Sequence, residues 1–308
     1  MRGEELVDWL LSGDAAVQYQ THRDLLHVRR DDLRSRISTE GWGSRFLGAR
    51  QNDHWGKGFY QPKWISTHYT VLDLKNLGLI PSHAGVRQAV VRALAAHRGS
   101  DGGIYPIGAS RSSDVCVNGM FLNYASYFGV DERDLASIVD FLLAQHMADG
   151  GFNCDSNTSR GALHSSLHST VSVLEGILEY TASDNSYRVP ELERAASGGR
   201  EFMLRHELFR SDRTGRVIDD RMLRLSYPAR WRYDILRALD YLRGAGVEYD
   251  PRMADALGIL KRKRRADGRW PLQAKHPGQV HFDMEKGGEP SRWNTLRALR
   301  VLDHFESE

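Results

Sequence analysis

Apolar residues recur at helical spacing in several segments of the chain, and polar loops separate these segments. Between Val86 and Leu94, and again between Leu135 and Leu143, the apolar positions are three or four residues apart. Residues at these intervals lie on one face of an α-helix. The pattern therefore predicts amphipathic helices that each bury one face.

Each of these helices is followed by the same type of turn. Its clear copies are Asp-Gly-Gly-Ile-Tyr at 101–105, Asp-Gly-Gly-Phe-Asn at 149–153 and Asp-Gly-Arg-Trp at 267–270. Weaker copies stand at 53–56 and 212–215. Because a turn recurs between helical segments, the chain is predicted to repeat one supersecondary unit.

A second helix is predicted after each turn, beyond a polar loop. Two of these segments begin alike, with Pro-Ala-Arg-Trp at 228–231 and Pro-Ser-Arg-Trp at 290–293, and both continue into Leu-Arg-Ala-Leu. This likeness indicates duplication. The predicted second helices span 67–77, 115–127, 165–180, 230–242 and 291–305.

The unit is thus a helix, an Asp-Gly turn, a loop and a second helix, with a period of about 50 residues. Strand signals are nearly absent. The loops, at about 12–20 residues, are longer than the usual connection between neighbouring helices. We therefore expect an all-α protein whose helix pairs close into a ring around a central cavity.

Composition adds few constraints. The 308 residues are 41% hydrophobic and 27% charged, with no linker that divides them, so we expect one domain over 1–308. A net charge of +2 argues against a nucleic-acid partner. The basic run 261–265 is expected to be a solvated helix end, with a polyanion site as the alternative. No apolar run is long enough to span a bilayer, and two cysteines are too few for a disulfide scaffold, so a cytoplasmic protein is expected.

The Asp-Gly-Gly-aromatic turn, leading through a loop to an inner helix, resembles the repeat of the terpenoid cyclase and protein prenyltransferase β-subunit superfamily. The similarity covers about Trp55 to Phe305. It implies an α/α toroid of about five to six helical hairpins, a number in keeping with the repeat period. Residues 1–37 lie outside it and are expected to be N-terminal capping helices.

The resemblance also implies a zinc site. In the prenyltransferase branch an Asp-x-Cys pair opens one inner helix and a His opens the next, and Asp114, Cys116 and His168 occupy these positions. A carboxylate, a thiolate and an imidazole would leave one zinc position open, as in catalytic sites. Cys154 and His164 are alternative ligands. The alternative without metal is a buried thiol and a satisfied core histidine.

Other positions match the family's diphosphate site in part. His68 and Arg111 correspond to a His and a Lys that contact the lipid diphosphate, whereas Val117 and Gly108 replace a Tyr and an Arg. Loop anchoring is the alternative role for His68 and Arg111.

Aromatic residues at predicted inner-helix starts are candidates for binding an isoprenoid, or for core packing. They are Trp231, Tyr233 and Trp293.

Two further groups of polar residues are candidates for chemistry. Arginines beside the aromatic residues suit a carboxylate or phosphate, because the guanidinium group is planar. The loop 281–285 offers acid/base groups or a second metal site, with a purely structural role in the loop as the alternative. These residues are Arg230, Arg232, Arg292, His281, Asp283 and Glu285.

The expected function is zinc-dependent prenyl transfer from an isoprenoid diphosphate, with Asp114, Cys116 and His168 as catalytic residues. The alternatives are a metal-free terpenoid cyclase or isomerase and a non-catalytic toroid that binds a ligand. The Asp-x-Asp-Asp acid of the cyclase branch is absent, since Asp219 and Asp220 stand in another context. The sequence identifies no protein partner.

Overall fold

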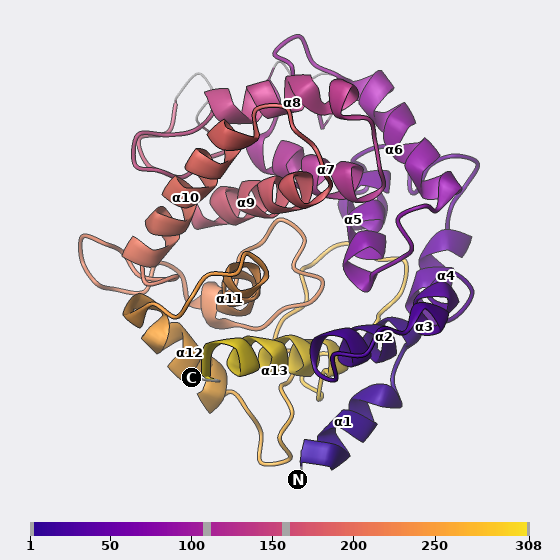
Figure 1. Cartoon of the computed structure of the whole chain (residues 1–308), viewed down its shortest axis with the longest axis vertical. Coiled ribbons are helices and arrows are strands. Elements are labelled where there is room, and N and C mark those ends of the chain that lie inside the picture. Colours follow the sequence, from indigo (N-terminus) through magenta and orange to yellow (C-terminus); the bar gives the residue numbers. More distant parts are fainter. Residues whose placement is uncertain (1–2, 107–111, 156–160, 307–308) are drawn as a thin grey trace.

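The computed structural model describes residues 3–106, 112–155 and 161–306, which form a ring of helices in two layers (Figure 1). The second helix of each pair belongs to the inner layer and the first helix to the outer layer. The prediction of an all-α toroid is confirmed. The inner helices are α2 (Ala15–Asp24), α5 (Thr67–Leu77), α7 (Val115–Tyr127), α9 (Leu167–Ala182), α11 (Ile235–Gly244) and α13 (Arg292–Glu306).

The outer layer covers the inner one and faces solvent. Its helices bury one stripe each, as the amphipathic pattern predicts: in α8 the buried residues include Leu135, Ile138 and Leu142. The outer helices are α6 (Ala84–His97), α8 (Glu132–Ala144), α10 (Val189–Arg205) and α12 (Ala254–Arg262), and near the N-terminus lie α1 (Gly3–Leu11), α3 (Asp31–Arg36) and α4 (Gly41–Gly48).

The ring closes where α2 packs against α13. Arg300 of α13 makes this contact specific: its Nη1 donates to Asp24 Oδ2 over 2.6 Å and to Gln20 Oε1 over 3.1 Å. Its Nε donates to Asp240 Oδ1 of α11 over 2.7 Å. One buried guanidinium group of α13 therefore joins the inner helices α2 and α11.

The repeated turn attaches each outer helix to its inner helix. Asp101 accepts hydrogen bonds from the backbone and hydroxyl of Ser113, and Asp149 does the same for Ser165. The backbone N–H of Phe152, just beyond the turn, donates to Thr170 Oγ1 over 3.0 Å. Equivalent bonds in other repeats place the N-termini of inner helices at the same rim of the ring; they join Trp55 to Thr67, Ile104 to Asn118 and Trp270 to Thr295.

Helices α7 and α9 pack closest, because glycines face each other between them. A Cβ atom on Gly119 would lie 2.6 Å from the carbonyl oxygen of Ser172, and one on Gly176 would lie 2.3 Å from that of Gly119. No larger side chain fits there without moving a backbone. This approach brings the loop before α9 next to the start of α7.

Helix α11, the fourth of the predicted second helices, differs from its predicted span. The observed α11 begins at Ile235 rather than at 230, because Asp234 caps it by accepting from the N–H of Arg237 over 2.9 Å. Arg230 has a φ of 58°, outside the helical region. Trp231 and Tyr233, predicted at an inner-helix start, therefore lie in the loop before α11.

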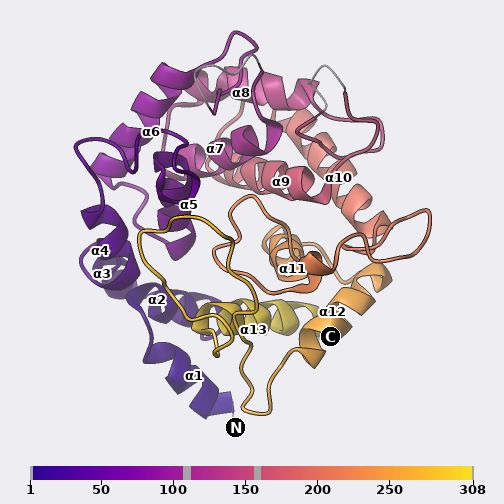
Figure 2. The same ribbon diagram turned by 180° about the vertical axis from the view of Figure 1, so that it is seen from behind.

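Long loops cross the middle of the ring on the face seen in Figure 2. They connect α10 to α11 and α12 to α13, and include the short 3-10 turn η2 (Asp220–Leu223). Two more such turns are η1 (Lys63–Ile65) and η3 (Pro251–Met253). Among the described residues, no helix has both the length and the apolar character needed to cross a bilayer.

Candidate functional site

Three potential metal ligands meet at the N-terminus of α7. One oxygen or sulfur atom each of Asp114, Cys116 and Cys154 lies within 4.8 Å of the other two. The thiols of Cys116 and Cys154 donate to Asp114 Oδ1 over 3.1 and 3.2 Å. The three residues come from two neighbouring repeats: Asp114 and Cys116 stand at the start of α7, and Cys154 follows the turn that precedes α9.

The backbone and a serine hold Cys154 in place. Its N–H donates to Ser169 Oγ over 3.1 Å, and its sulfur accepts from the N–H of Cys116 over 3.2 Å. The carboxylate of Asp114 caps α7 by accepting from the N–H of Val117 over 3.1 Å. The cluster is therefore fixed by helix-terminal and loop contacts, which leave little freedom to its side chains.

The cluster consists only of groups that lose a proton to become anionic. The hydrogen bond with Cys154, burial and the nearby Asp114 raise the pKa of the Cys116 thiol well above its ordinary value. Burial raises the pKa of Tyr60 well above its ordinary value, and Asp114 and both cysteines add to that rise. The neighbourhood of the cluster thus disfavours additional negative charge.

The spacing suits a tetrahedral zinc ion. With Zn–S bonds of about 2.3 Å and Zn–O bonds of about 2.0 Å, tetrahedral angles put two sulfurs about 3.8 Å apart and sulfur and oxygen about 3.5 Å apart. The thiol-to-carboxylate distances of 3.1 and 3.2 Å need to lengthen by only a few tenths of an ångström. Zinc also binds thiolate ligands more readily than harder cations do.

His168, predicted as the third ligand, is engaged elsewhere. Its Nδ1 accepts the N–H of Tyr233 over 2.8 Å, and its ring lies against Trp231 at 5.4 Å between centroids. Burial, together with Arg237 and Arg232, lowers its pKa to about 4. The structure thus brings together Asp114, Cys116 and the alternative Cys154, without His168.

The structure describes only some of the residues that were expected to contact a diphosphate. His68 is fully buried, its Nδ1 lies 3.0 Å from the hydroxyl of Tyr124, and burial lowers its pKa to about 3. Arg111 and Gly108 lie outside the described residues. His68 therefore belongs to a buried aromatic cluster rather than to an open surface.

Most of the predicted aromatic wall is packed in the core. Trp293 is 2% exposed and stacks on Tyr227 at 4.9 Å between ring centroids. Tyr233 is 3% exposed and donates its hydroxyl to the carbonyl oxygen of Leu208. Trp231 is partly exposed in the loop before α11.

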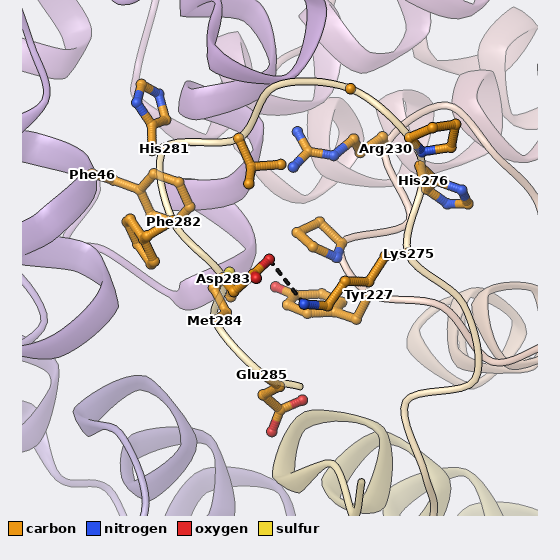
Figure 3. A pocket seen from close by; sticks show the side chains of 14 residues that line it. Phe46, Tyr227, Arg230, Lys275, His276, His281, Phe282, Asp283, Met284 and Glu285 are labelled. Carbon is orange, nitrogen blue, oxygen red and sulfur yellow. Dashed lines mark ion pairs between the residues drawn. The ribbon is translucent and has the colours of Figure 1, made fainter. Parts of the chain in front are cut away.

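The loop 275–285 encloses a pocket of about 240 Å³ (Figure 3). Lys275 pairs with Asp283 across it over 2.9 Å. The imidazole Nε2 of His281 lies 2.9 Å from Thr70 Oγ1, and burial lowers its pKa to about 4. Glu285 accepts from the N–H groups of Arg292 and Trp293 at the start of α13.

The predicted anion-binding arginines divide between two environments. Arg230 is buried and donates to the carbonyl oxygen of Trp64 over 3.1 Å, and Arg292 donates to the carbonyl oxygen of Trp9 over 2.9 Å. Arg232 instead lines a second pocket, with His168. Sequence patterns did not single out Arg221, Arg224, Lys275 or His276, which join them from two loops.

No protein-family model and no curated protein matches this sequence. The ring aligns with a glycosyl hydrolase family 88 protein from Bacteroides vulgatus at a TM-score of 0.49 and 13% identity, over 93% of this chain and 88% of that one. At this similarity the match carries no statement about what this chain does.

The predicted function is nevertheless wrong in its specific form. His68 and His168, on which prenyl transfer depended, are engaged in the contacts described above. The expectations of an isoprenoid-like substrate and of its cyclase and binding-only alternatives are withdrawn with it.

Proposed function

We propose that this protein is a zinc enzyme that hydrolyses a small molecule at the N-terminus of α7, with Asp114, Cys116 and Cys154 as zinc ligands. The observation that carries the proposal is the convergence of one carboxylate and two thiols within 4.8 Å. Three protein ligands leave a fourth position for water or substrate, the arrangement typical of catalytic zinc. When bound, zinc acts as a Lewis acid and lowers the pKa of water to about 7 in the most activated sites.

The surrounding residues have positioning roles in this proposal. Ser169 accepts from the backbone of Cys154 and donates to its sulfur over 3.2 Å, which orients that thiolate. Contacts of this kind typically change metal affinity 10- to 100-fold when removed. Asp114 keeps its carboxylate aimed at both thiols because the same oxygen accepts from Val117. Cys116 is 8% exposed, so bulk water has little access to its sulfur.

The test is the metal content of the purified chain. Wild-type protein should hold about one zinc per chain, as expected for one site with three protein ligands. Cys116→Ser should lose most of it. Hydrolysis of small chromogenic esters and phosphoesters should require the metal and disappear in the same variant.

The matched control is Ser126→Ala, which alters a buried hydroxyl at the other end of α7 and should retain the zinc. Thiol titration under denaturing conditions should find two free thiols after chelation. A wild type that takes up no zinc from a metal buffer, or a stable Cys116–Cys154 disulfide in a reducing medium, would overturn the proposal.

A further inference from the structure

A second pocket, with a volume of about 250 Å³, lies where the loop before α11 meets the loop before α13. Its charged lining is unusually one-sided: Arg221, Arg224, Arg232 and Lys275 face a single carboxylate, that of Asp219. A concave site lined by one sign of charge focuses its field on whatever occupies it. The charge of the lining therefore favours a negatively charged occupant.

Two of the cations already have carboxylate partners. Arg221 contacts Asp219 through its Nη2 over 2.6 Å, and Lys275 contacts Asp283 in the neighbouring pocket over 2.9 Å. These pairs hold the two loops in place. Asp219, which pairs with Arg221, is the only carboxylate in this pocket's lining. The remaining positive charge of the lining therefore has no counter-charge there.

Arg232 has no such partner among the described residues. Its Nε is buried from solvent and makes no hydrogen bond, although its guanidinium group lies 4.8 Å from the ring centre of Trp231. His276, on the facing loop, likewise has a buried Nε2 without a hydrogen bond. A buried polar group left without a partner costs free energy, which a bound acceptor would recover.

His168 adds a donor of defined orientation. Because its Nδ1 accepts the N–H of Tyr233, the neutral ring carries its proton on Nε2. Burial and the neighbouring arginines lower the pKa of both His168 and His276 to about 4, so both rings are neutral near pH 7. Arg232 and the His168 N–H thus offer donors to an oxyanion.

We propose that this pocket binds the carboxylate or phosphate group of a small molecule, with Arg232 as its main anchor and His168 as a second donor. The guanidinium group forms paired hydrogen bonds with planar oxyanions, and such charge-assisted bonds are roughly twice as strong as neutral ones. The pocket volume admits a small organic anion but no macromolecule.

This inference is independent of the proposed zinc site but adjacent to it. His168 lines the pocket, and the next residue, Ser169, contacts Cys154. Consecutive residues of α9 therefore take part in both places.

The test is calorimetric titration of the full chain with sodium phosphate and with sodium succinate, at constant ionic strength. One of these probes should bind saturably at one site, and glycerol, which carries no charge, should not. Arg232→Gln should weaken binding at least tenfold. Arg29→Gln, which removes the same charge from an exposed position, should leave it unchanged.

Two results would overturn the inference: no saturable binding of either probe to the wild type, or equal weakening by Arg29→Gln and Arg232→Gln. The titrations are repeated with Cys116→Ser, in which the zinc ligands are incomplete. Anion binding should persist there, so a failure of the zinc proposal and a failure of this one give different results. Whether phosphate or succinate binds more tightly identifies the oxyanion.

Discussion

The sulfur of Cys154 lies 3.2 Å from Oδ1 of Asp114, although 40 residues separate them along the chain. The two residues come from neighbouring repeats, and two features of the fold bring them together. The Asp-Gly turn fixes the loop that carries Cys154, through Asp149 and Ser165. The glycine contact between α7 and α9 then draws the two repeats close.

The first prediction separates the two candidate ligand sets. Cys154→Ser should lose zinc because it removes a thiolate from the cluster, whereas His168→Gln should retain it, because the Nδ1 of His168 accepts from Tyr233. The measurement is zinc content by atomic emission after gel filtration in a metal-buffered solution. Retention of zinc by Cys154→Ser together with its loss from His168→Gln would restore the ligand set expected from sequence.

The sequence was sufficient for the ring because helical periodicity and the Asp-Gly turn are local signals. The spans 67–77 and 115–127 are those observed for α5 and α7. The start of α11 was missed because its segment has two more residues than α13 between the shared Trp and the Leu-Arg-Ala-Leu motif. Those residues include Asp234, which caps the helix later than the duplication suggests.

The site was harder to predict because it depends on contacts between loops. Asp114 and Cys116 were found from their place at a helix start. Whether Cys154 or His168 joins them depends on the backbone path of the loop before α9, which leaves no periodic pattern. The basic pocket likewise combines Arg232 with Lys275, 43 positions further along the chain.

The second prediction concerns the repeated turn. Gly150 has a φ of 95°, and a Cβ there would lie 2.8 Å from the carbonyl oxygen of Gly198. Gly150→Ala should therefore destabilise the protein by more than the roughly 1 kcal/mol that a positive φ alone costs. Gly129→Ala is the matched control, because Gly129 has a φ of 69° and no atom near the added Cβ. Equal losses of unfolding free energy in urea would show that the contact with Gly198 is unimportant.

The third prediction concerns closure of the ring. Arg300→Met keeps most of the side-chain volume but leaves Asp24 and Asp240 buried with fewer partners. Breaking a buried pair in this way costs about 3–5 kcal/mol, and we expect the lower end because Arg297 still contacts Asp240.

The control is Arg243→Met, which removes a more exposed partner of the same Asp240 and should cost about 1 kcal/mol or less. Urea unfolding measures both. Limited proteolysis should cleave the N-terminal helices faster in Arg300→Met than in the control. A loss confined to Arg243→Met would mean that the contact of α2 with α13 does not hold the ring closed.

The last prediction is a fall in stability below neutral pH caused by His68. Its pKa is about 3 in the folded chain because burial disfavours the charged ring, whereas the unfolded chain has an ordinary value of about 6.5. Below pH 6.5 the unfolded state binds a proton that the folded state does not, so acid favours unfolding. Between pH 7 and pH 5 this one group should reduce the unfolding free energy by about 2 kcal/mol at most, since each pH unit below 6.5 contributes about 1.4 kcal/mol.

His68→Gln, which cannot titrate, should show a correspondingly shallower decline in urea unfolding over that range, whatever its stability at pH 7. His27→Gln, at an exposed position, should decline as the wild type does. Identical slopes for all three proteins would show that His68 is protonated as easily in the folded chain as in the unfolded one, and would contradict its place in the buried cluster with Tyr124.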